Sequence, residues 1–485
     1  MKTSIKLGPL FVCLISLVTL LISSCSFLPT QSNYLKESST GVPMLYLWQN
    51  KNSHSNNEVT LKLVVKFGSL QEMDSQLGYA HFVEHMAFNG SARFPDSAFQ
   101  ARLKELDLSI GDHSNAVTTF DRSVYTFYLK SAEKDKLTGA IDILSEWVSA
   151  IEFSNAGVEQ EKAVLIRELG RAAAVESVVA QAFQADHAGT HQLNRTPKDI
   201  AASINNATPA LLTAFYKKWY VAENMAIIIA GDINTDFTQR IVHQHFKPTR
   251  TDTYIKPTAY PSNYVDSPEF LVFSNNLNQT NKVGLNFITA IEPITRTEDL
   301  IPMLAWQAGL DIWLDRVDQS GETLNLWLYA DYEWGHPNHT QRIVTLEAEV
   351  PDGKYQQVIS LLETERLSLI HHGITQVELD QWRTSLLEYE QVQQDSADHL
   401  ANELEELFIS GWPAKGQRKW VKALKKELPK LTTDDIQNAF KKLTDSQHRI
   451  RIGIKPTAVA PSEQQVSEWL AAAALETALR PSQAD

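Results

Sequence analysis

Two histidines and a glutamate lie within five residues of the segment GYAHFVEHMAFNG, which runs from Gly78 to Gly90. His81 and His85 stand four residues apart, so on a helix their imidazole rings share a face and can reach one metal ion. Glu84 lies beside them, where its carboxylate can take a proton from a metal-bound water. Metal-assisted hydrolysis requires these groups, because zinc lowers the pKa of its bound water and polarises a carbonyl group. The alternative is an ordinary helix with three polar side chains in water.

A third protein ligand would favour the zinc site, since a catalytic zinc ion takes about three ligands from the protein. The segment VEQEKAVLIREL, from Val158 to Leu169, places Glu161 and Glu168 seven residues apart. Seven residues are about two helical turns, so the two carboxylates share one face of the predicted helix. Either glutamate could complete a site with the two histidines. The alternative is that both are surface residues, as most glutamates on helices are.

Length, charge and cysteine content limit the classes of protein to consider. The chain has 485 residues, which is enough for more than one buried core. Charged residues make up 21% and hydrophobic residues 43%, as in ordinary globular domains. The net charge is -14 and no basic stripe is present, so nucleic acid is not an expected partner. The two cysteines, Cys13 and Cys25, both lie near the N-terminus, which excludes a cysteine-ligated metal site.

The N-terminus has the pattern of an export signal. A basic start (MKTSIK) precedes an apolar run over residues 10–22, and two serines and Cys25 follow. The run is shorter than the roughly 20 residues that a membrane-spanning helix needs. The pattern resembles a bacterial lipoprotein signal, which implies removal of residues 1–24 and a lipid anchor on Cys25. Ser26 in place of an aspartate favours the outer membrane, facing the periplasm of a Gram-negative-type bacterium. An uncleaved anchor or a plain secretory signal is the alternative.

Hydrophobic periodicity predicts the elements that carry these residues. Residues 59–67 (VTLKLVVKF) alternate as a strand does, residues 77–88 form a helix, and residues 115–129 form two extended segments joined by a turn. A similar order of strands and helices follows from residue 270. The expected fold class is therefore α+β, with two homologous α/β sandwich domains. Residues 375–407 predict one acidic amphipathic helix whose polar face lies in water.

These patterns also predict the limits of the domains. A polar stretch rich in serine, threonine and asparagine predicts a flexible tether, and a polar stretch with prolines predicts a linker. The predicted parts are a signal peptide over residues 1–24, the tether over 25–42, a catalytic domain over 43–248, the linker over 249–266, a second domain over 267–456 and a C-terminal tail over 457–485.

Four segments together resemble one family of enzymes. They are GSLQEMDSQLGYAHFVEHMAFNGSARFP around the histidines, NAVTTFDRSVY from Asn115, EKAVLIRE from Glu161, and FYKKWYVAENMAIIIAGDI ending at Ile233. They resemble the pitrilysin/insulinase family of zinc metallopeptidases, the inverzincins, whose motif has the order H-x-x-E-H. The resemblance covers residues 43–245, and the second half is similar to the family's non-catalytic domain in pattern alone.

The resemblance implies a zinc-dependent endopeptidase with one zinc ion per chain, acting on peptides or unfolded polypeptide segments in the cell envelope. It implies that His81, His85 and Glu168 bind the metal. Glu84 would be the general base that activates the zinc-bound water. Glu161 would support the site by orienting or assisting the other groups.

The resemblance also implies how substrate is held. Asn115 and Ala116 would lie on an edge strand that pairs with the backbone of an extended peptide. The alternative is a purely structural strand. Family members often have a tyrosine where this chain has Val117, which leaves the fine substrate preference open.

The family's working unit resembles a clamshell of four such domains, and this chain supplies two of them. The resemblance therefore implies a half-clamshell that pairs with a second copy or with a homologous chain. The alternative function is a non-catalytic binding or assembly subunit of a peptidase complex with the same fold. Glu84 argues against that alternative, because a binding subunit has no use for a general base.

Overall fold

The computed structural model describes a large part of the chain. The described residues are 34–39, 41–49, 57–111, 113–119, 121–175, 197–248, 269–274, 280–290, 300–320, 324–331, 341–393, 396–410, 417–444 and 449–479. The predicted signal peptide, the predicted lipidation site Cys25 and the predicted linker lie outside these residues.

The first half of the chain builds a six-stranded sheet in the order β1-β2-β6-β3-β5-β4. Its strands are β1 (Leu35–Ser39), β2 (Val42–Gln49), β3 (Val59–Val65), β4 (Ser114–Thr118), β5 (Ser123–Leu129) and β6 (Met225–Gly231). Strands β2 and β6 run parallel, and the other neighbours are antiparallel. Every residue of β3 and of β6 is buried, so the centre of this sheet is covered on both faces.

The second half builds a five-stranded sheet in the order β7-β11-β8-β10-β9. Its strands are β7 (Phe270–Ser274), β8 (Asn281–Ala290), β9 (Leu326–Asp331), β10 (Gln341–Val350) and β11 (Arg449–Ile454). If β1 is left out and the strands of each half are numbered along the chain, the two sheets have the same strand order. In both sheets the first and last strands of the half form the parallel pair. This shared topology is that of two homologous sandwich domains, as the sequence predicted.

Helices cover the two sheets. Those of the first half are α2 (Tyr79–Phe88), α3 (Asp96–Glu105), α4 (Lys134–Ser149), α5 (Asn155–Val175), α7 (Pro197–Asn206), α8 (Pro209–Trp219) and α9 (Thr235–His245). Those of the second half are α10 (Leu300–Gln319), α11 (Tyr355–His372), α12 (Gln376–Gln393), α13 (Ala397–Ser410), α14 (Gln417–Glu427), α15 (Thr433–Thr444) and α16 (Glu463–Leu479). Short 3-10 helices span Ser69–Gln71, Asp74–Gln76, Ala222–Asn224 and Leu428–Lys430.

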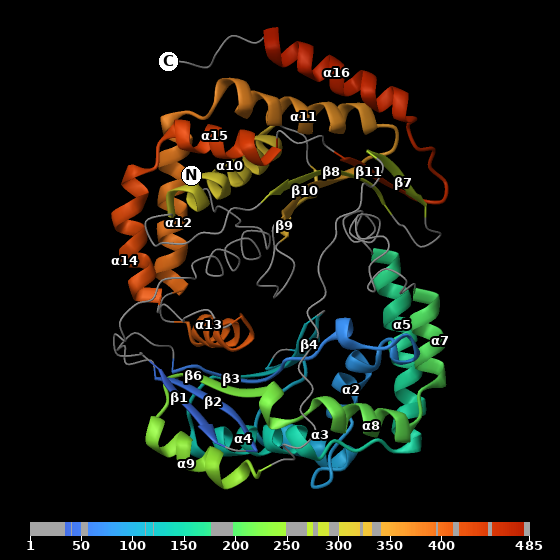
Figure 1. The fold of residues 1–485 in the computed structure, drawn as a ribbon, viewed down its shortest axis with the longest axis vertical. Coiled ribbons are helices and arrows are strands. Elements are labelled where there is room, and N and C mark those ends of the chain that lie inside the picture. Colours follow the sequence, from blue (N-terminus) through green and yellow to red (C-terminus); the bar gives the residue numbers. More distant parts are fainter. Residues whose placement is uncertain are drawn as a thin grey trace.

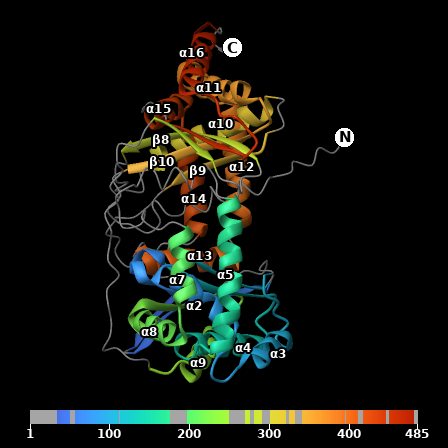
Figure 2. The same ribbon diagram turned by 90° about the vertical axis from the view of Figure 1, so that its right-hand side faces the viewer.

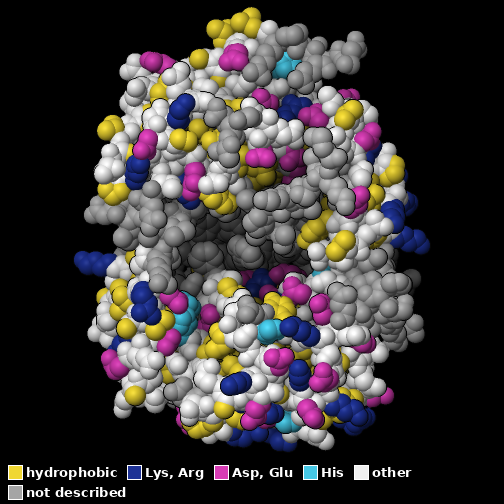
Figure 3. Space-filling model, turned by 180° about the vertical axis from the view of Figure 1, so that it is seen from behind, with side chains coloured by type: hydrophobic (Ala, Val, Ile, Leu, Met, Phe, Trp, Pro, Cys, Tyr) yellow, Lys and Arg dark blue, Asp and Glu magenta, His cyan; other side chains and the backbone are white. Residues whose placement is uncertain are grey.

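The two halves face each other across the interior of the molecule. Helices α4 and α9 lie on the outer side of the first sheet, and α10, α11 and α15 lie on the outer side of the second (Figure 1). Helices α5 and α7 run side by side from the first half toward the second (Figure 2). Seen from behind, the surface is hollowed between the halves (Figure 3).

Helix α13 belongs to the second half of the chain but packs on the first sheet. It lies on the inner face, opposite α4 (Figure 1). A buried apolar cluster joins it to strands β2, β3, β5 and β6, and its buried members are Tyr46, Trp48, Val64, Val124, Ala226, Ile228, Ala230, Leu400, Ala401, Leu404 and Phe408. Polar contacts add to the cluster: Lys62 Nζ on β3 lies 2.8 Å from Glu405 Oε2 on α13. The central strands β3 and β6 thus receive their second cover from a distant part of the chain.

Two predictions about local structure need correction. The tether over residues 25–42 was predicted to be flexible, but Leu35–Ser39 form β1, paired with β2. This edge strand is polar because most of its side chains are exposed, so its composition resembles that of a linker. The single helix over residues 375–407 is divided into α12 and α13, and Glu405 on the expected solvent face meets Lys62 instead.

Most of the predicted C-terminal tail forms helix α16. Ser462 and Gln465 exchange hydrogen bonds at its start, an arrangement that caps a helix N-terminus. Val466 and Ala473 are buried, and α16 packs against α11. We propose residues 43–248 and 267–456 as the two domains, with α13 as a segment of the second that covers the first. Among the described residues, none of the helices combines the length and apolarity that a bilayer crossing requires.

Leu404→Ala is expected to lower the free energy of unfolding by about 2–5 kcal/mol, because Leu404 is fully buried between α13 and the first sheet. Val392→Ala on α12 is the control, since Val392 is 76% exposed and its loss should change stability by less than about 0.5 kcal/mol. Guanidinium unfolding followed by tryptophan fluorescence measures both. Equal midpoints for the two variants would contradict the packing described for α13.

Candidate metal centre

Helix α2 begins at a glycine that its geometry requires. Gly78 has a φ of +82°, in the left-handed region that favours glycine, and a Cβ there would lie 3.1 Å from the Ile204 side chain. The Glu72 carboxylate accepts hydrogen bonds from the amides of Gly78 (2.9 Å) and Ala80 (2.8 Å). A carboxylate at this end of a helix is favourable, because the free amides there carry partial positive charge. These contacts fix the start of the helix that presents both histidines.

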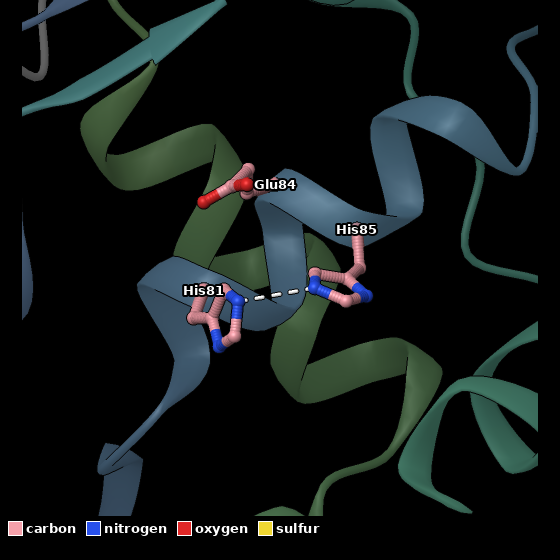
Figure 4. Close-up of side chains that lie close together, drawn as sticks. All are labelled: His81, Glu84 and His85. Atoms are coloured by element: carbon pink, nitrogen blue, oxygen red, sulfur yellow. Dashed lines mark hydrogen bonds between the residues drawn. The ribbon is translucent and has the colours of Figure 1, made fainter. Parts of the chain in front are cut away.

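The two histidines direct their Nε2 atoms toward each other. His81 and His85 lie one turn apart on α2, and their Nε2 atoms are 3.0 Å apart (Figure 4). The rings stand at 89° to each other, with centroids 4.5 Å apart. The opposite face of α2 is buried in the core through Phe82, Val83 and Met86. The core therefore holds the helix in the orientation that brings the two imidazoles together.

Glu168, on α5, approaches both histidines from the side. Its Oε2 lies 3.3 Å from His85 Nε2 and 3.8 Å from His81 Nε2. Three ligand atoms around a tetrahedral zinc ion, each at about 2.0–2.1 Å, would be about 3.3–3.4 Å from one another. The three measured separations of 3.0, 3.3 and 3.8 Å lie around that value. The donor set of two imidazoles and one carboxylate therefore fits a zinc ion.

Glu161 lies two turns earlier on α5 and contacts the other nitrogen of His85. Its Oε1 is 2.8 Å from His85 Nδ1, and its Oε2 accepts a hydrogen bond of 3.1 Å from Asn89. Glu161 and Glu168 therefore meet opposite sides of the His85 ring. A carboxylate bonded to the far nitrogen of a metal-binding imidazole fixes its tautomer and its orientation.

The charges of these groups depend on one another. Burial raises the pKa of Glu161, but hydrogen bonds from His85 and Asn89 outweigh it and lower that pKa below its usual value. Burial lowers the pKa of His85, but the bond to Glu161 and the nearby Glu168 and Glu84 carboxylates raise it overall. Burial and the neighbouring His85 lower the pKa of His81. His81 is therefore neutral at pH 7, the form in which imidazole binds a metal.

Glu84 is the most buried member of the cluster. Its side chain lies on α2 beside the pair of histidines, and one ligand atom from each of the three residues lies within 4.8 Å of the others (Figure 4). Glu84 is 7% exposed, and burial raises its pKa to about 7 against the effect of a hydrogen bond from Thr118. A carboxylate with a pKa near the working pH can both accept and return a proton.

Strand β4 forms one edge of the first sheet, next to α2. Among the described residues it pairs with β5 along one side only. Asn115 is exposed, Ala116 is half-buried, and Val117 is 50% exposed. The side chain of Asn115 accepts a hydrogen bond from the amide of Ala116 (2.9 Å). The predicted substrate-binding residues thus lie on an edge strand.

Sequence reasoning missed three residues that contact the site. Thr118 Oγ1 donates to Glu84 Oε2 at 2.5 Å, Asn89 donates to Glu161, and Glu72 caps α2. Asn89 follows His85 by one helical turn, a spacing that could have suggested its place. Thr118 lies 34 residues from Glu84, so no local spacing indicates its contact. Glu72 is close in the chain to the amides that it caps, but it precedes the helix and lies outside the helical spacing.

Two family models match this chain. The model described as insulinase (peptidase family M16) matches residues 49–200, and that of the peptidase M16 inactive domain matches residues 206–386. The chain therefore belongs to the M16, or insulinase, family of peptidases. The resemblance that the motifs indicated is confirmed, and the second half corresponds to the inactive domain.

Two relatives with similar sequences are named as probable zinc proteases. The probable zinc protease PqqL of Escherichia coli is 26% identical over 341 residues, which are 69% of this chain and 36% of that protein. The probable zinc protease PqqL of Haemophilus influenzae is 34% identical over 196 residues, which are 40% of this chain and 21% of that protein. The matched parts thus span far less than the whole of these relatives.

Solved structures share the fold over nearly the whole chain. The crystal structure of the periplasmic protease PqqL from Escherichia coli has a TM-score of 0.74 at 22% identity, over 94% of this chain and 51% of that chain. The structure of the first half of that protease has a TM-score of 0.73 at 22% identity and is covered to 99%. The fold of this chain is therefore that of a half-clamshell.

Glu161→Gln is expected to weaken zinc binding about 10–100-fold, because glutamine holds the far nitrogen of His85 less firmly than a carboxylate does. Glu168→Gln should weaken it more, since it removes a charge that faces both histidines. Competition with a fluorescent chelator measures the dissociation constants. Glu159→Gln, an exposed change on the same helix, is the control. A larger loss for Glu161→Gln than for Glu168→Gln would exchange the roles of the two glutamates.

Proposed function

We propose that the chain is a zinc-dependent endopeptidase of the cell envelope. In this proposal His81, His85 and Glu168 bind one zinc ion, Glu84 is the general base, and Glu161 orients His85. The observation that supports it most directly is the triangle of ligand atoms, with separations of 3.0, 3.3 and 3.8 Å, beside a buried glutamate. A merely structural helix would have no reason to collect these groups.

Bound zinc would polarise the scissile carbonyl and make the attacking water more acidic. Glu84 accepts the proton from that water and returns it to the departing amine. Burial raises the pKa of Glu84 above the usual value of a carboxyl group, which makes the carboxylate a better base toward that proton. The hydrogen bond from Thr118 holds one oxygen of Glu84 and leaves the other to act.

The substrate in this proposal is an extended peptide or an unfolded segment. Asn115 and Ala116 hold its backbone by strand addition at the edge formed by β4, which supports acceptance of many sequences. Peptide backbone is common to all substrates, so specificity would come from side-chain contacts around the edge. Val117, half exposed on this strand, is one such contact.

A second half-clamshell completes the proposed working unit. The Escherichia coli protease whose fold this chain shares is about twice as long, and this chain covers 51% of it. We propose that a second copy of this chain, or a homologous chain, supplies the other half. The lipoprotein-like signal and the periplasmic relative support a place on the outer membrane, facing the periplasm, with lipid on Cys25.

Glu84→Gln is expected to lower kcat for peptide cleavage by about 10²–10⁴-fold while zinc stays bound, because the amide cannot accept the proton from water. Digestion of a quenched-fluorescent peptide library, with and without a chelator, measures the activity. Glu105→Gln, an exposed change on α3, is the control.

Unchanged cleavage by Glu84→Gln would refute the proposed base. A wild-type protein that binds zinc and cleaves no peptide, alone or with a partner half, would instead favour a non-catalytic binding or assembly subunit.

A further inference from the structure

The general base is held by the last residue of an edge strand. Thr118 ends β4, and its hydroxyl donates to Glu84 at 2.5 Å. A catalytic group that is displaced by about 1 Å can lose about 10²-fold in rate. The position of the end of β4 therefore matters for any proton transfer through Glu84.

The end of β4 is held by a turn that leads into β5. The amide of Thr119 donates to the carbonyl of Arg122 at 2.8 Å, which closes the turn. The hydroxyls of Thr118 and Ser123 lie 3.3 Å apart across it, and Ser123 also donates to the carbonyl of Phe67 at 3.1 Å. From this turn, the side chain of Arg122 extends into the interior.

Arg122 is bound by carboxylates from the other half of the chain. It is 3% exposed, and its guanidinium lies 3.1 Å from Glu405 Oε1, 2.5 Å from Glu406 Oε1 and 3.0 Å from Asp121 Oδ1. A buried guanidinium needs fixed partners, because water cannot solvate it. Glu405 also binds Lys62 on β3 at 2.8 Å. Helix α13 thus ties the β4–β5 turn to the centre of the sheet.

We propose that Glu405 and Glu406 are positioning residues for Glu84, acting through Arg122 and Thr118. This inference rests on the proposed function, in which Glu84 is the base. It gives the second half of the chain a part in catalysis, because helix α13 holds the strand end that orients the catalytic carboxylate. The two carboxylates touch no reacting atom in this scheme, so their loss changes the position of Glu84 and leaves the metal ligands in place.

A double-mutant cycle tests this route. Thr118→Val is expected to lower kcat about 10–100-fold with zinc affinity unchanged, and Thr118→Ser, which keeps the hydroxyl, should restore most of it. Glu406→Gln replaces a charged hydrogen bond by a neutral one and should lower kcat about fivefold. In the Thr118→Val background Glu406→Gln should have no further effect, because the link it acts through is absent.

Three results in this cycle would overturn the proposal. One is an equal loss from Glu406→Gln in both backgrounds, which would mean that the residue acts independently of Thr118. Another is no loss in the wild-type background. The third is a change in KM or zinc affinity without a change in kcat. Arg122→Met is the more drastic variant, but it leaves three carboxylates near each other and can unfold the domain, so Glu406→Gln carries the test.

Hydrogen exchange supplies a readout that does not depend on activity. Glu406→Gln should speed amide exchange over residues 114–123 and leave α4 and α9 unchanged. Glu403→Gln is the matched control, since Glu403 lies on the same helix and pairs there with His399 at 3.6 Å. Unchanged exchange over residues 114–123 would overturn the proposal. A wild-type protein without chelator-sensitive cleavage would overturn the proposed function instead, and the exchange result would still decide whether α13 holds the turn.

Discussion

The contact between α5 and the two nitrogens of His85 is the constraint on which the site depends. Glu161 reaches Nδ1 and Glu168 approaches Nε2. Helix α5 must therefore pack on α2 at one position along its own axis and with one rotation about that axis. The core sets both, because Val158 and Leu165, also seven residues apart, are buried on a neighbouring stripe of α5. Apolar packing thus fixes how α5 sits against α2, and this packing sets the positions of the two glutamates. A helix with the same glutamates but a weaker apolar stripe would hold neither nitrogen.

The two halves of the chain share a strand topology but carry different side chains on it. Helix α10 follows β8, the strand that corresponds to β3 before α2, but the sequence of α10 has no histidine. Instead Trp313 is buried in the core and Asp311 accepts a hydrogen bond from Trp382 (2.8 Å). Helix α10 therefore takes the place of α2 in the scaffold without the two histidines that α2 carries. The second half contributes α13, and the first sheet depends on that helix to cover strands β3 and β6.

The sequence predicted what depends on local spacing. The four-residue step from His81 to His85 indicated a shared face, and two similar series of strands and helices indicated two similar domains. Spacing alone could not separate Glu161 from Glu168, because both lie on one face of α5 and differ only in which nitrogen of His85 they meet. The position of α13 could not be predicted either, because it depends on contacts between distant parts of the chain. Its pattern shows that it has an apolar face, but Lys62 and Glu405 are 343 residues apart in the chain and nothing local pairs them.

The packing of α13 also limits how a clamshell of this kind can open. Separating the two halves of this chain would expose Leu400, Leu404 and Phe408 together with the face of the sheet that they cover. Arg122 and Lys62 would also lose their carboxylate partners on α13. Both changes are costly, because apolar surface would meet water and buried charges would lose their pairs. The halves within one chain are therefore expected to move as a unit. The opening that admits a peptide to β4 then has to lie between this chain and the second half-clamshell that we propose as its partner.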